Sequence, residues 1–408
     1  MRASPVVTIS IVALLAGPAA SIAQTPEAET RQDVIERGQA DKADDLHPYV
    51  QSRGEEVMGR VQDFLVNQRI RWYPFLQNAY SGGGLALGAG YRQFVSAYST
   101  VDVRGSYSIQ DFKLAEVEFR SPRLFHRRAA LSVVGGWRDA PAVGFYALGD
   151  DPSAGAHLSY GFEEAYGSAL LTVWPTRRLL MVRGGAELAK WDLKSGSGVF
   201  PSVDTRYTPD TLAALGQATT YVHTQATVGL DYRRAFDWLP SPGYARRGGF
   251  YGVTAHDYAD HDSRFGFRQL TYDAVQHVPI LRETWVASLR GRVESSWGKS
   301  DQEVPFYLLP SLGGHSSLRG YPSWRFRGRN SLLLQGEWRF IANRGFETAV
   351  FYDAGKVAER TSDLDLKDLH TDYGFGARFH ALHATFLRVE VAHGSEGYRL
   401  VFASSAGF

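Results

Sequence analysis

An arginine in a glycine-rich loop, followed by two carboxylates, is the clearest set of residues able to form a specific contact. The run Leu318-Arg319-Gly320-Tyr321 precedes Glu337 and Asp353, which fall on the same face of two successive segments of alternating polarity. The planar fork of an arginine matches a carboxylate, and removing one partner of such a pair in a confined space is costly. The glycine after the arginine allows the loop to approach a wall closely. We predict that Arg319 pairs with one of these carboxylates; the alternative is an ordinary surface-loop arginine.

Two further sets of residues could carry chemistry, but neither has a specific signature. Four side chains able to bind a metal lie near an expected loop, where such residues are common: His256, Asp260, His261 and Asp262. Ser288 and His277 lie on neighbouring segments and could form a wall-borne pair, yet serine and histidine are routine on a polar barrel lining. The sequence contains no Gly-x-Ser-x-Gly elbow, Walker motif or His-Glu-x-x-His motif. We predict no enzymatic activity, no metal and no cofactor.

A two-residue periodicity identifies the elements that would position these side chains. In the segment 284–296, apolar Trp285, Leu289 and Val293 alternate with polar Arg290 and Glu294, and the same pattern recurs along the chain. The polar face carries both signs of charge on segment after segment, as a wet or salt-bridged barrel lumen requires. A soluble β-sandwich is the alternative, but lipid cannot satisfy an open sheet edge, and a closed barrel removes that edge.

Counting backward from the carboxy-terminal segment gives fifteen alternating segments: 397–408, 384–393, 371–380, 346–355, 331–340, 284–296, 266–278, 249–259, 219–233, 179–193, 158–174, 129–139, 111–121, 99–109 and 82–95. Because an even number is expected when both ends of a barrel face the periplasm, a further strand is needed, and residues 69–80 are the best candidate. We therefore predict an all-β, transmembrane antiparallel β-barrel of sixteen strands over residues 69–408.

The lengths of the links between these segments alternate. Short links such as 122–128 and 341–345 suit periplasmic turns, whereas the long links 194–218, 297–330 and 356–370 suit external loops. The sequence thus predicts which end of the barrel faces the periplasm.

The first residues have the layout of an export signal. A basic start is followed by a mostly apolar run from Val6 to Leu15 and by small residues up to Ala23. An amino-terminal anchor is the alternative, but this run falls short of the roughly 20 apolar residues that a spanning helix needs. We predict a signal peptide over residues 1–23, cleaved after Ala23.

Composition agrees with an exported barrel. The chain has no cysteine, so we expect its stability to come from a source such as a hydrogen-bonded barrel rather than from disulfides. Its 42 glycines and 13% aromatic residues suit outer-membrane strands, although a soluble β-sandwich would fit equally well. The formal net charge of +1 gives no reason to propose a nucleic-acid partner.

Residues 24–68 differ from the rest of the chain. They are charged and mostly polar, and a stripe of Val57, Val61, Phe64 and Leu65 indicates an amphipathic helix from Glu55 to Asn67. We predict a periplasmic lead-in, partly helical; the alternative is a helix that plugs the lumen.

The long loop and the strands after it resemble the BamA-like bacterial surface antigen superfamily. The residues that carry the resemblance are Gly313–Tyr321 and Arg325–Gly328 in the loop, Gly336–Phe340 on the next segment and Phe351-Tyr352-Asp353-Ala354-Gly355 on the one after. Barrels of this family have sixteen strands, a Val/Leu-Arg-Gly-Phe/Tyr tetrad in an infolded sixth external loop, and Phe-x-Asp-x-Gly on the thirteenth strand. Our count places both motifs at those positions.

Two weaker motifs agree with the resemblance, which covers roughly residues 75–408. Asp231-Tyr232-Arg233, leading to Pro240–Gly243, is similar to the family's Asp-x-Arg and Pro-x-x-Gly turn. Phe145–Gly149 looks like a motif of the short members, with Ala147 where glycine is more usual.

The resemblance implies a long infolded sixth external loop, with Leu318, Arg319, Gly320 and Tyr321 forming a latch. The expected acceptors on the barrel wall are Glu337, Phe351, Asp353 and Gly355. Relatives insert barrel proteins or translocate polypeptides, and their POTRA repeats receive clients. Residues 24–68 are too short for one repeat, so we expect a short form without POTRA repeats.

The carboxy-terminal segment indicates how the barrel itself is assembled. Tyr398, Leu400, Phe402 and Phe408 fall on the face that we assign to lipid, which is typical of the signal that the barrel assembly machinery reads on its clients. We expect an outer-membrane location in a Gram-negative cell, contacts with outer-membrane lipids, and unfolded polypeptides as clients. Three function classes stay open: an assembly or translocation barrel, a passive or gated pore, and a wall-borne enzyme, which nothing specific favours.

Overall fold

The computed structural model describes residues 71–176, 179–234, 245–281, 284–343, 345–380, 385–404 and 407, together with Ile35. The chain divides into two compact units, Met1–Gly59 and Arg60–Phe408, and the second holds all the strands. The predicted signal peptide lies outside the described residues, as does the predicted lead-in apart from Ile35. No helix in the part that is described is long and apolar enough to cross a membrane.

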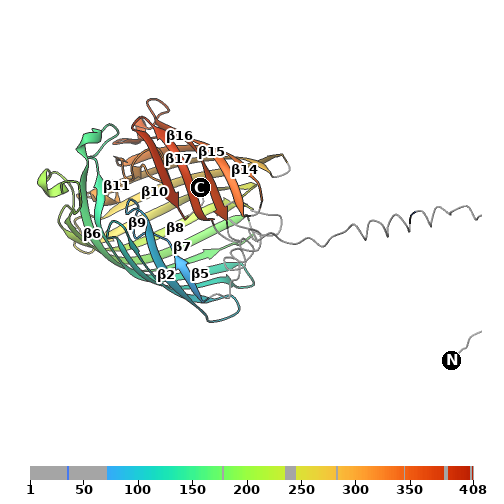
Figure 1. Cartoon of the computed structure of the whole chain (residues 1–408). Coiled ribbons are helices and arrows are strands. Elements are labelled where there is room, and N and C mark those ends of the chain that lie inside the picture. Colours follow the sequence, from blue (N-terminus) through green and yellow to red (C-terminus); the bar gives the residue numbers. More distant parts are fainter. Residues whose placement is uncertain are drawn as a thin grey trace, which may run out of the picture. The chain divides into compact units, whose positions relative to one another are not determined.

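One antiparallel sheet of sixteen strands, each paired with its neighbour in the sequence, makes up the second unit (Figure 1). The strands are β1 (Trp72–Phe75), β2 (Ala86–Phe94), β3 (Thr100–Ser108), β4 (Lys113–Leu124), β5 (Ala129–Phe145), β6 (Leu158–Val173), β7 (Leu180–Ser195), β8 (Ala218–Asp231), β9 (Gly248–Asp260), β10 (Phe267–Leu281), β11 (Trp285–Gly298), β14 (Asn330–Ile341), β15 (Phe346–Ala358), β16 (His370–His380), β17 (Thr385–Gly394) and β18 (Gly397–Ala403). The predicted all-β barrel of sixteen strands is confirmed, including the first strand, which pairs Trp72 with Tyr91.

The remaining elements are short and lie in the links. A two-stranded ladder joins β12 (Ser311–Leu312) to β13 (Phe326–Arg327) within the link between β11 and β14. Within the described residues, four 3-10 helices occur: η1 (Ala154–Ala156), η2 (Val203–Thr205), η4 (Phe306–Leu308) and η5 (Thr361–Asp363). The long links are therefore folded and carry elements of their own.

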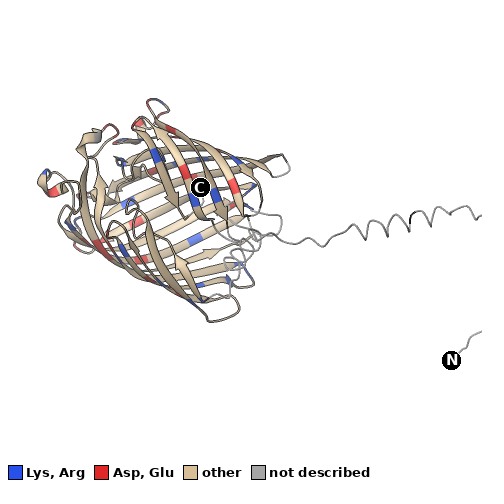
Figure 2. Cartoon of the chain, viewed as in Figure 1, with Lys and Arg blue, Asp and Glu red and all other residues tan. Residues whose placement is uncertain are grey.

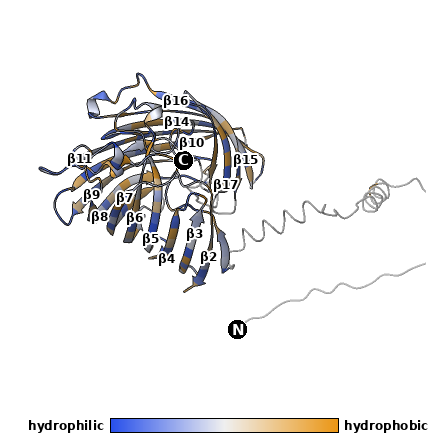
Figure 3. Ribbon diagram, turned by 60° about the vertical axis from the view of Figure 1, so that its left-hand side comes forward, coloured by the Kyte–Doolittle hydropathy of each residue, from blue (hydrophilic) through white to orange (hydrophobic). Residues whose placement is uncertain are grey.

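The two faces of the sheet differ as the alternation predicts. On the outer face, Leu289 and Phe375 are 64% and 62% exposed. On the inner face, Arg104 contacts Glu116 and Glu118, each at 2.8 Å. Figure 2 shows charged residues of both signs on successive strands, and Figure 3 shows hydrophilic and hydrophobic residues alternating along them. An apolar outer face around a charged interior is the arrangement of a barrel that sits in lipid.

The two ends of the sheet carry different links, and the predicted order is confirmed. At one end, which we call the short-turn end, residues 125–128 join β4 to β5 and residues 342–345 join β14 to β15. At the other, the long-loop end, the links between strands include residues 196–217, 299–329 and 359–369. By our prediction the short-turn end faces the periplasm.

An aromatic core fills the interior at the long-loop end. Phe306, in the link 299–329, packs edge-on against the strand residues Tyr160 and Phe145, with ring centroids 4.9 and 5.4 Å apart. The backbone N–H of Phe306 also donates to the carbonyl of Ala213 in the link 196–217, at 3.3 Å. The long loops are therefore packed together inside the sheet, and they support the site described next.

Candidate functional site: the infolded loop and the Arg319 network

The link 299–329 folds into the barrel and buries the tetrad. Leu318, Arg319 and Tyr321 are all 1% exposed or less. Leu318 and Tyr321 belong to a small buried cluster with members from the loop and from the wall: Leu312, Leu318, Tyr321, Phe326, Leu333 and Val357. The infolded sixth external loop that the resemblance implied is thus present.

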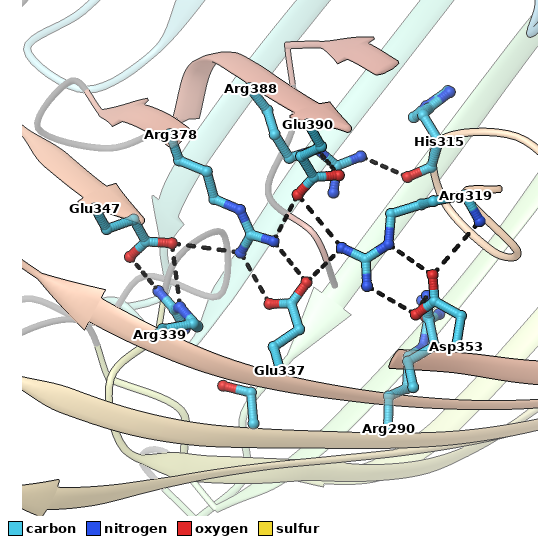
Figure 4. Close-up of polar contacts among 12 residues, drawn as sticks. Arg290, His315, Arg319, Glu337, Arg339, Glu347, Asp353, Arg378, Arg388 and Glu390 are labelled. Carbon is cyan, nitrogen blue, oxygen red and sulfur yellow. Dashed lines mark hydrogen bonds and ion pairs between the residues drawn. The ribbon is translucent and has the colours of Figure 1, made fainter. Parts of the chain in front are cut away.

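The guanidinium of Arg319 meets three carboxylates from three strands, as Figure 4 shows. Its Nε and Nη2 donate to the two oxygens of Asp353 on β15, each at 2.7 Å. Its Nη1 donates to Oε1 of Glu337 on β14 at 2.7 Å and to Oε1 of Glu390 on β17 at 3.3 Å. The contact with Asp353 is the parallel two-bond geometry that makes arginine–carboxylate pairs strong and directional.

The wall residue Phe351 also contacts the guanidinium of Arg319. Its ring centroid lies 3.5 Å from Cζ of Arg319, so the cation stands over the face of the ring. The structure thus brings Arg319 together with three of the four predicted wall residues, Glu337, Phe351 and Asp353, and it forms ion pairs with the two carboxylates.

A wider set of charges surrounds this contact and forms what we call the Arg319 network. Its members, four arginines and four acidic residues, are all at most 6% exposed: Arg319, Arg339, Arg378, Arg388, Glu337, Glu347, Asp353 and Glu390. Arg378 on β16 donates to Glu337 at 2.5 Å and to Glu390 at 2.9 Å. Seven of these eight side chains form hydrogen bonds to an opposite charge, and Nε of Arg388 lies 3.6 Å from Oε2 of Glu390, so the buried charges are paired as burial of ionised groups requires.

The network also contacts the backbone of two links. Arg339 forms a two-bond pair with Glu347 and donates from Nη1 to the carbonyl of Ala245, 2.7 Å away. Arg388 donates to the carbonyl of His315 in the infolded loop. The loop is therefore connected to the wall by backbone as well as by side-chain contacts.

Two glycines of the motifs stand where a side chain would collide. A Cβ at Gly320 would lie 2.6 Å from Cβ of Asp372, and a Cβ at Gly355 would lie 2.7 Å from the carbonyl oxygen of Leu332. The tetrad tyrosine lies at the same wall, since the Tyr321 hydroxyl donates to the carbonyl of Thr371 at 3.2 Å. Close approach of the loop to the wall explains the glycine at 320, and close approach of the neighbouring strand β14 explains the glycine at 355.

The link between β5 and β6 holds the infolded loop from the other side. The N–H of Gly149 donates to the carbonyl of Arg327 at 2.8 Å, and Arg325 donates to the carbonyl of Pro152 at 2.7 Å. Ala147, at the position where the similar motif usually has glycine, has φ +83°, a conformation that favours glycine. The motif of residues 145–149 therefore belongs to the same site.

A histidine at the end of this link sits in an aromatic stack. His157 lies between Tyr146 and Phe200, with ring centroids 4.2 and 3.5 Å away. Burial, and secondarily the charge of Arg325, lowers the pKa of His157 to about 4. The ring is therefore neutral at neutral pH, which suits an apolar stack.

Five members of the network were missing from the predicted site, namely Arg339, Glu347, Arg378, Arg388 and Glu390. The alternation already put Arg378 and Glu390 on the inner face. Nothing in the sequence says that these side chains meet Glu337, because that contact spans several strands and depends on their stagger.

The other candidate residues have separate surroundings. Asp260 accepts hydrogen bonds from the N–H groups of Arg264 and Phe265 and so closes a turn, while His256 meets His223 with ring nitrogens 3.0 Å apart. No group of three or more metal-ligating side chains able to hold an ion occurs within the described ranges.

The serine and histidine on neighbouring strands do meet. Ser288 Oγ lies 2.8 Å from Nδ1 of His277, and both side chains are buried inside the sheet. As placed, the pair offers no surface to a substrate.

The outer face of β18 carries three residues of the predicted assembly signal. Tyr398, Leu400 and Phe402 are all exposed there. Phe408 lies outside the described residues. Pro240–Gly243 also lies outside them, while Arg233 forms a two-bond pair with Asp231.

A sixteen-stranded antiparallel sheet with an apolar outer face and an arginine-bearing loop folded against its own wall defines the class as an outer-membrane β-barrel. The Omp85 superfamily domain matches residues 48–381, so this chain belongs to the Omp85 superfamily. No curated protein matches the sequence.

Two solved structures, BamA from Haemophilus ducreyi and CdiB from Escherichia coli, show the same fold. BamA from Haemophilus ducreyi lacking POTRA domains 1–3 is 17% identical over 82% of this chain and 67% of that one, with a TM-score of 0.54. CdiB from Escherichia coli is 13% identical over 82% and 61%, with a TM-score of 0.50. CdiB from Acinetobacter baumannii is 11% identical over 78% and 56%, with a TM-score of 0.49. This chain thus spans less than two thirds of the length of either CdiB chain.

Proposed function

We propose that this barrel works in outer-membrane biogenesis, inserting or translocating polypeptides or lipids, and that it receives its client between β1 and β18. The observation that carries the proposal is an open edge. The order of the sheet begins at β1 and ends at β18, and no ladder joins these two strands where they are described. Lipid cannot satisfy the backbone N–H and C=O groups of an open edge, whereas an extended client segment would do so by adding a strand.

The strands at this edge are paired over short lengths. β1 pairs with β2 through four residues, and β18 pairs with β17 through seven. By contrast, β5 and β6 are 17 and 16 residues long. A short ladder has few hydrogen bonds to break, so a client strand would displace or extend it at low cost.

The Arg319 network supports the wall beside this edge. Apart from Arg319 in the infolded loop, its members lie on β14, β15, β16 and β17, and β17 is the partner of β18. We propose that Arg319 is a latch: it holds the infolded loop against Asp353 and Glu337, and this keeps the wall rigid while the edge moves. We further propose that the barrel is itself a client of the barrel assembly machinery, with Tyr398, Leu400 and Phe402 as part of the signal.

The test is an insertion assay with the full barrel in liposomes. An unfolded client barrel is added, and the rate at which it becomes protease-resistant is compared with that in empty liposomes. The proposal predicts a faster rate with the barrel, and a loss of this acceleration in Arg319→Ala.

A matched control separates the latch from a general loss of charge. Arg206 is an exposed arginine in another long loop and has no ion pair with any described residue, so Arg206→Ala should insert clients at the wild-type rate. No acceleration by a correctly folded wild-type barrel would reject the insertase proposal.

A gated pore is the second candidate, because the inner face carries charged residues of both signs on β3, β4 and β11. The infolded loop and the aromatic core at the long-loop end argue against a wide, permanently open channel. Conductance of the barrel in a planar bilayer tests this: large, constant steps would favour a pore over an insertase.

A further inference from the structure

Adjacent turns at the short-turn end form a surface that is both basic and apolar. We call it the turn patch; it comprises residues 95–99, 122–128 and 174–176. Phe125 is 75% exposed, and Arg123, Arg127 and Arg128 around it are exposed as well. An aromatic side chain at the tip of a turn, surrounded by arginines, is not explained by packing within the chain.

Contacts between the turns make the patch continuous. The guanidinium carbon of Arg123 lies 4.2 Å from the ring centroid of Tyr98 in the neighbouring turn. The N–H of Trp174 donates to the carbonyl of Arg128 at 2.8 Å. Arg123 and Arg128 are thus held near the same surface by turns that belong to three hairpins.

Among the described residues, the arginines of the patch have no acidic partner. None of the residues 95–99, 122–128 and 174–176 is Asp or Glu, and Arg123, Arg127 and Arg128 form no ion pair with any described residue. Inside the barrel the same strands pair their arginines, as Arg104 does with Glu116 at 2.8 Å. Within the described residues, these three arginines are therefore exposed cations without a counterion.

The backbone of the central turn of the patch, residues 125–128, is strained, and Phe125 in this turn is exposed. Phe125, His126 and Arg127 have φ values of +48°, +58° and +68°, three consecutive non-glycine residues in the left-handed region. This conformation is unfavourable for residues with a Cβ, and such strain clusters at functional sites. Because Phe125 gains no burial in return, an external contact is the natural reason for the turn.

The position of the turn patch relative to the apolar outer band indicates what the patch binds. The strands above it carry exposed apolar side chains on the lipid-facing side, among them Val117 on β4, Val133 on β5 and Leu171 on β6. Leu171 is only three residues from Trp174 in the patch. The patch therefore begins where the apolar band ends, which is the level of lipid headgroups, and arginine with aromatic side chains suits that interface.

We propose that the turn patch binds anionic phospholipid headgroups at the short-turn face of the membrane. Arg123, Arg127 and Arg128 would contact phosphate oxygens, since the arginine fork matches phosphate geometry, and Phe125 would enter the interface between headgroups and acyl chains. The proposal depends on the barrel lying in a membrane and does not depend on insertase activity.

The test compares lipid retention by the full-length barrel and its variants. Barrels are held in mixed micelles with equal amounts of phosphatidylglycerol and phosphatidylcholine, and the lipids that remain bound are counted by native mass spectrometry. Wild type should retain phosphatidylglycerol preferentially. The triple variant Arg123→Gln, Arg127→Gln, Arg128→Gln should lose on the order of a hundredfold in this preference, because each basic residue near an anionic lipid surface contributes roughly a fivefold attraction.

Two control variants keep the result interpretable. Lysine at the same three positions preserves the charge and should restore most of the preference. The triple variant Arg206→Gln, Arg360→Gln, Lys367→Gln removes three exposed charges from the long-loop end and should leave the preference unchanged. Heat-modifiable migration on a gel confirms that each variant is folded.

Equal retention of the two lipids by wild type would overturn the proposal. So would a preference that survives the loss of all three arginines, or one that falls equally in the long-loop control. Retention of an acidic periplasmic protein in place of lipid would assign the patch to a protein partner instead.

Discussion

Ion pairs on two parts of the barrel wall use the same residue types in opposite environments. On β14 and β16, Glu337 and Arg378 form a pair in which both side chains are 2% exposed. On β4, Arg120 pairs with Glu118, but the arginine side chain is 52% exposed. Alternation directs both pairs to the inner face, and only the first lies under the infolded loop. The infolded loop, and not the sequence of the wall alone, therefore buries the charge network away from water.

Breaking the contact between loop and wall should have the largest effect. Arg319→Ala leaves the buried carboxylate of Asp353 without its guanidinium partner, and Asp353→Ala removes the two-bond partner of Arg319, which keeps only its contacts with Glu337 and Glu390. Loss of one partner of a buried ion pair costs about 3–5 kcal/mol. We expect both variants to give a lower yield of folded barrel and a lower urea midpoint, measured by heat-modifiable migration. Unchanged folding in both would refute the latch.

Crowding the same contact without removing charge should have a smaller effect. In Gly320→Ala the new methyl group would lie 2.6 Å from Cβ of Asp372, so the loop must shift. Overpacking of this kind typically costs about 1–3 kcal/mol. Gly167→Ala is the matched control, because nothing lies within 4 Å of a Cβ there. Equal urea midpoints for the two variants would contradict close packing at Gly320.

Relieving strain on the other side of the loop should stabilise the barrel slightly. Ala147 has φ +83°, and a residue with a Cβ in a left-handed conformation costs roughly 1–2 kcal/mol. Ala147→Gly should therefore raise the urea midpoint. Ala165→Gly on the exposed face of β6 should not raise it, since Ala165 has no positive φ. A lower midpoint for Ala147→Gly would show that the conformation is not strained.

Removing a charge from the uncovered wall should have the smallest effect. Arg120→Ala removes a largely exposed arginine, and Glu118 keeps its contacts with Arg104 and Ser132. Exposed pairs contribute about 0–1 kcal/mol. We expect the urea midpoint to stay within the error of the wild type. A loss as large as that of Asp353→Ala would remove the distinction between the two parts of the wall.

Much of the fold could be predicted from the sequence because a strand repeats every two residues. The pattern located the strands, assigned Leu289 and Phe375 to the outer face, and placed Arg378 and Glu390 inside. It could not predict that Arg378 bridges Glu337 and Glu390, because that contact depends on the stagger of four strands and the length of each side chain. The positive φ of Ala147 could not be predicted either, because the alternation of polarity carries no information about backbone angles in a loop.

The candidate site was predicted in part. Motif spacing brought Arg319, Glu337 and Asp353 together, since the tetrad and the Phe-x-Asp-x-Gly strand carry a specific signature. The support from Gly149 and Pro152 was not predicted, because backbone contacts between two loops leave no residue-type signal.

A double-mutant cycle on Arg319 and Asp353 tests directly whether this pair holds the infolded loop to the barrel wall. Urea unfolding of Arg319→Ala, Asp353→Ala and the double variant gives the interaction free energy between the two side chains. If this pair holds the loop to the wall, the double variant should be about as stable as either single variant, because either change alone already breaks the ion pair between Arg319 and Asp353. Losses that simply add in the double variant would show that the two residues act independently, and would contradict the central claim that this pair holds the loop to the wall.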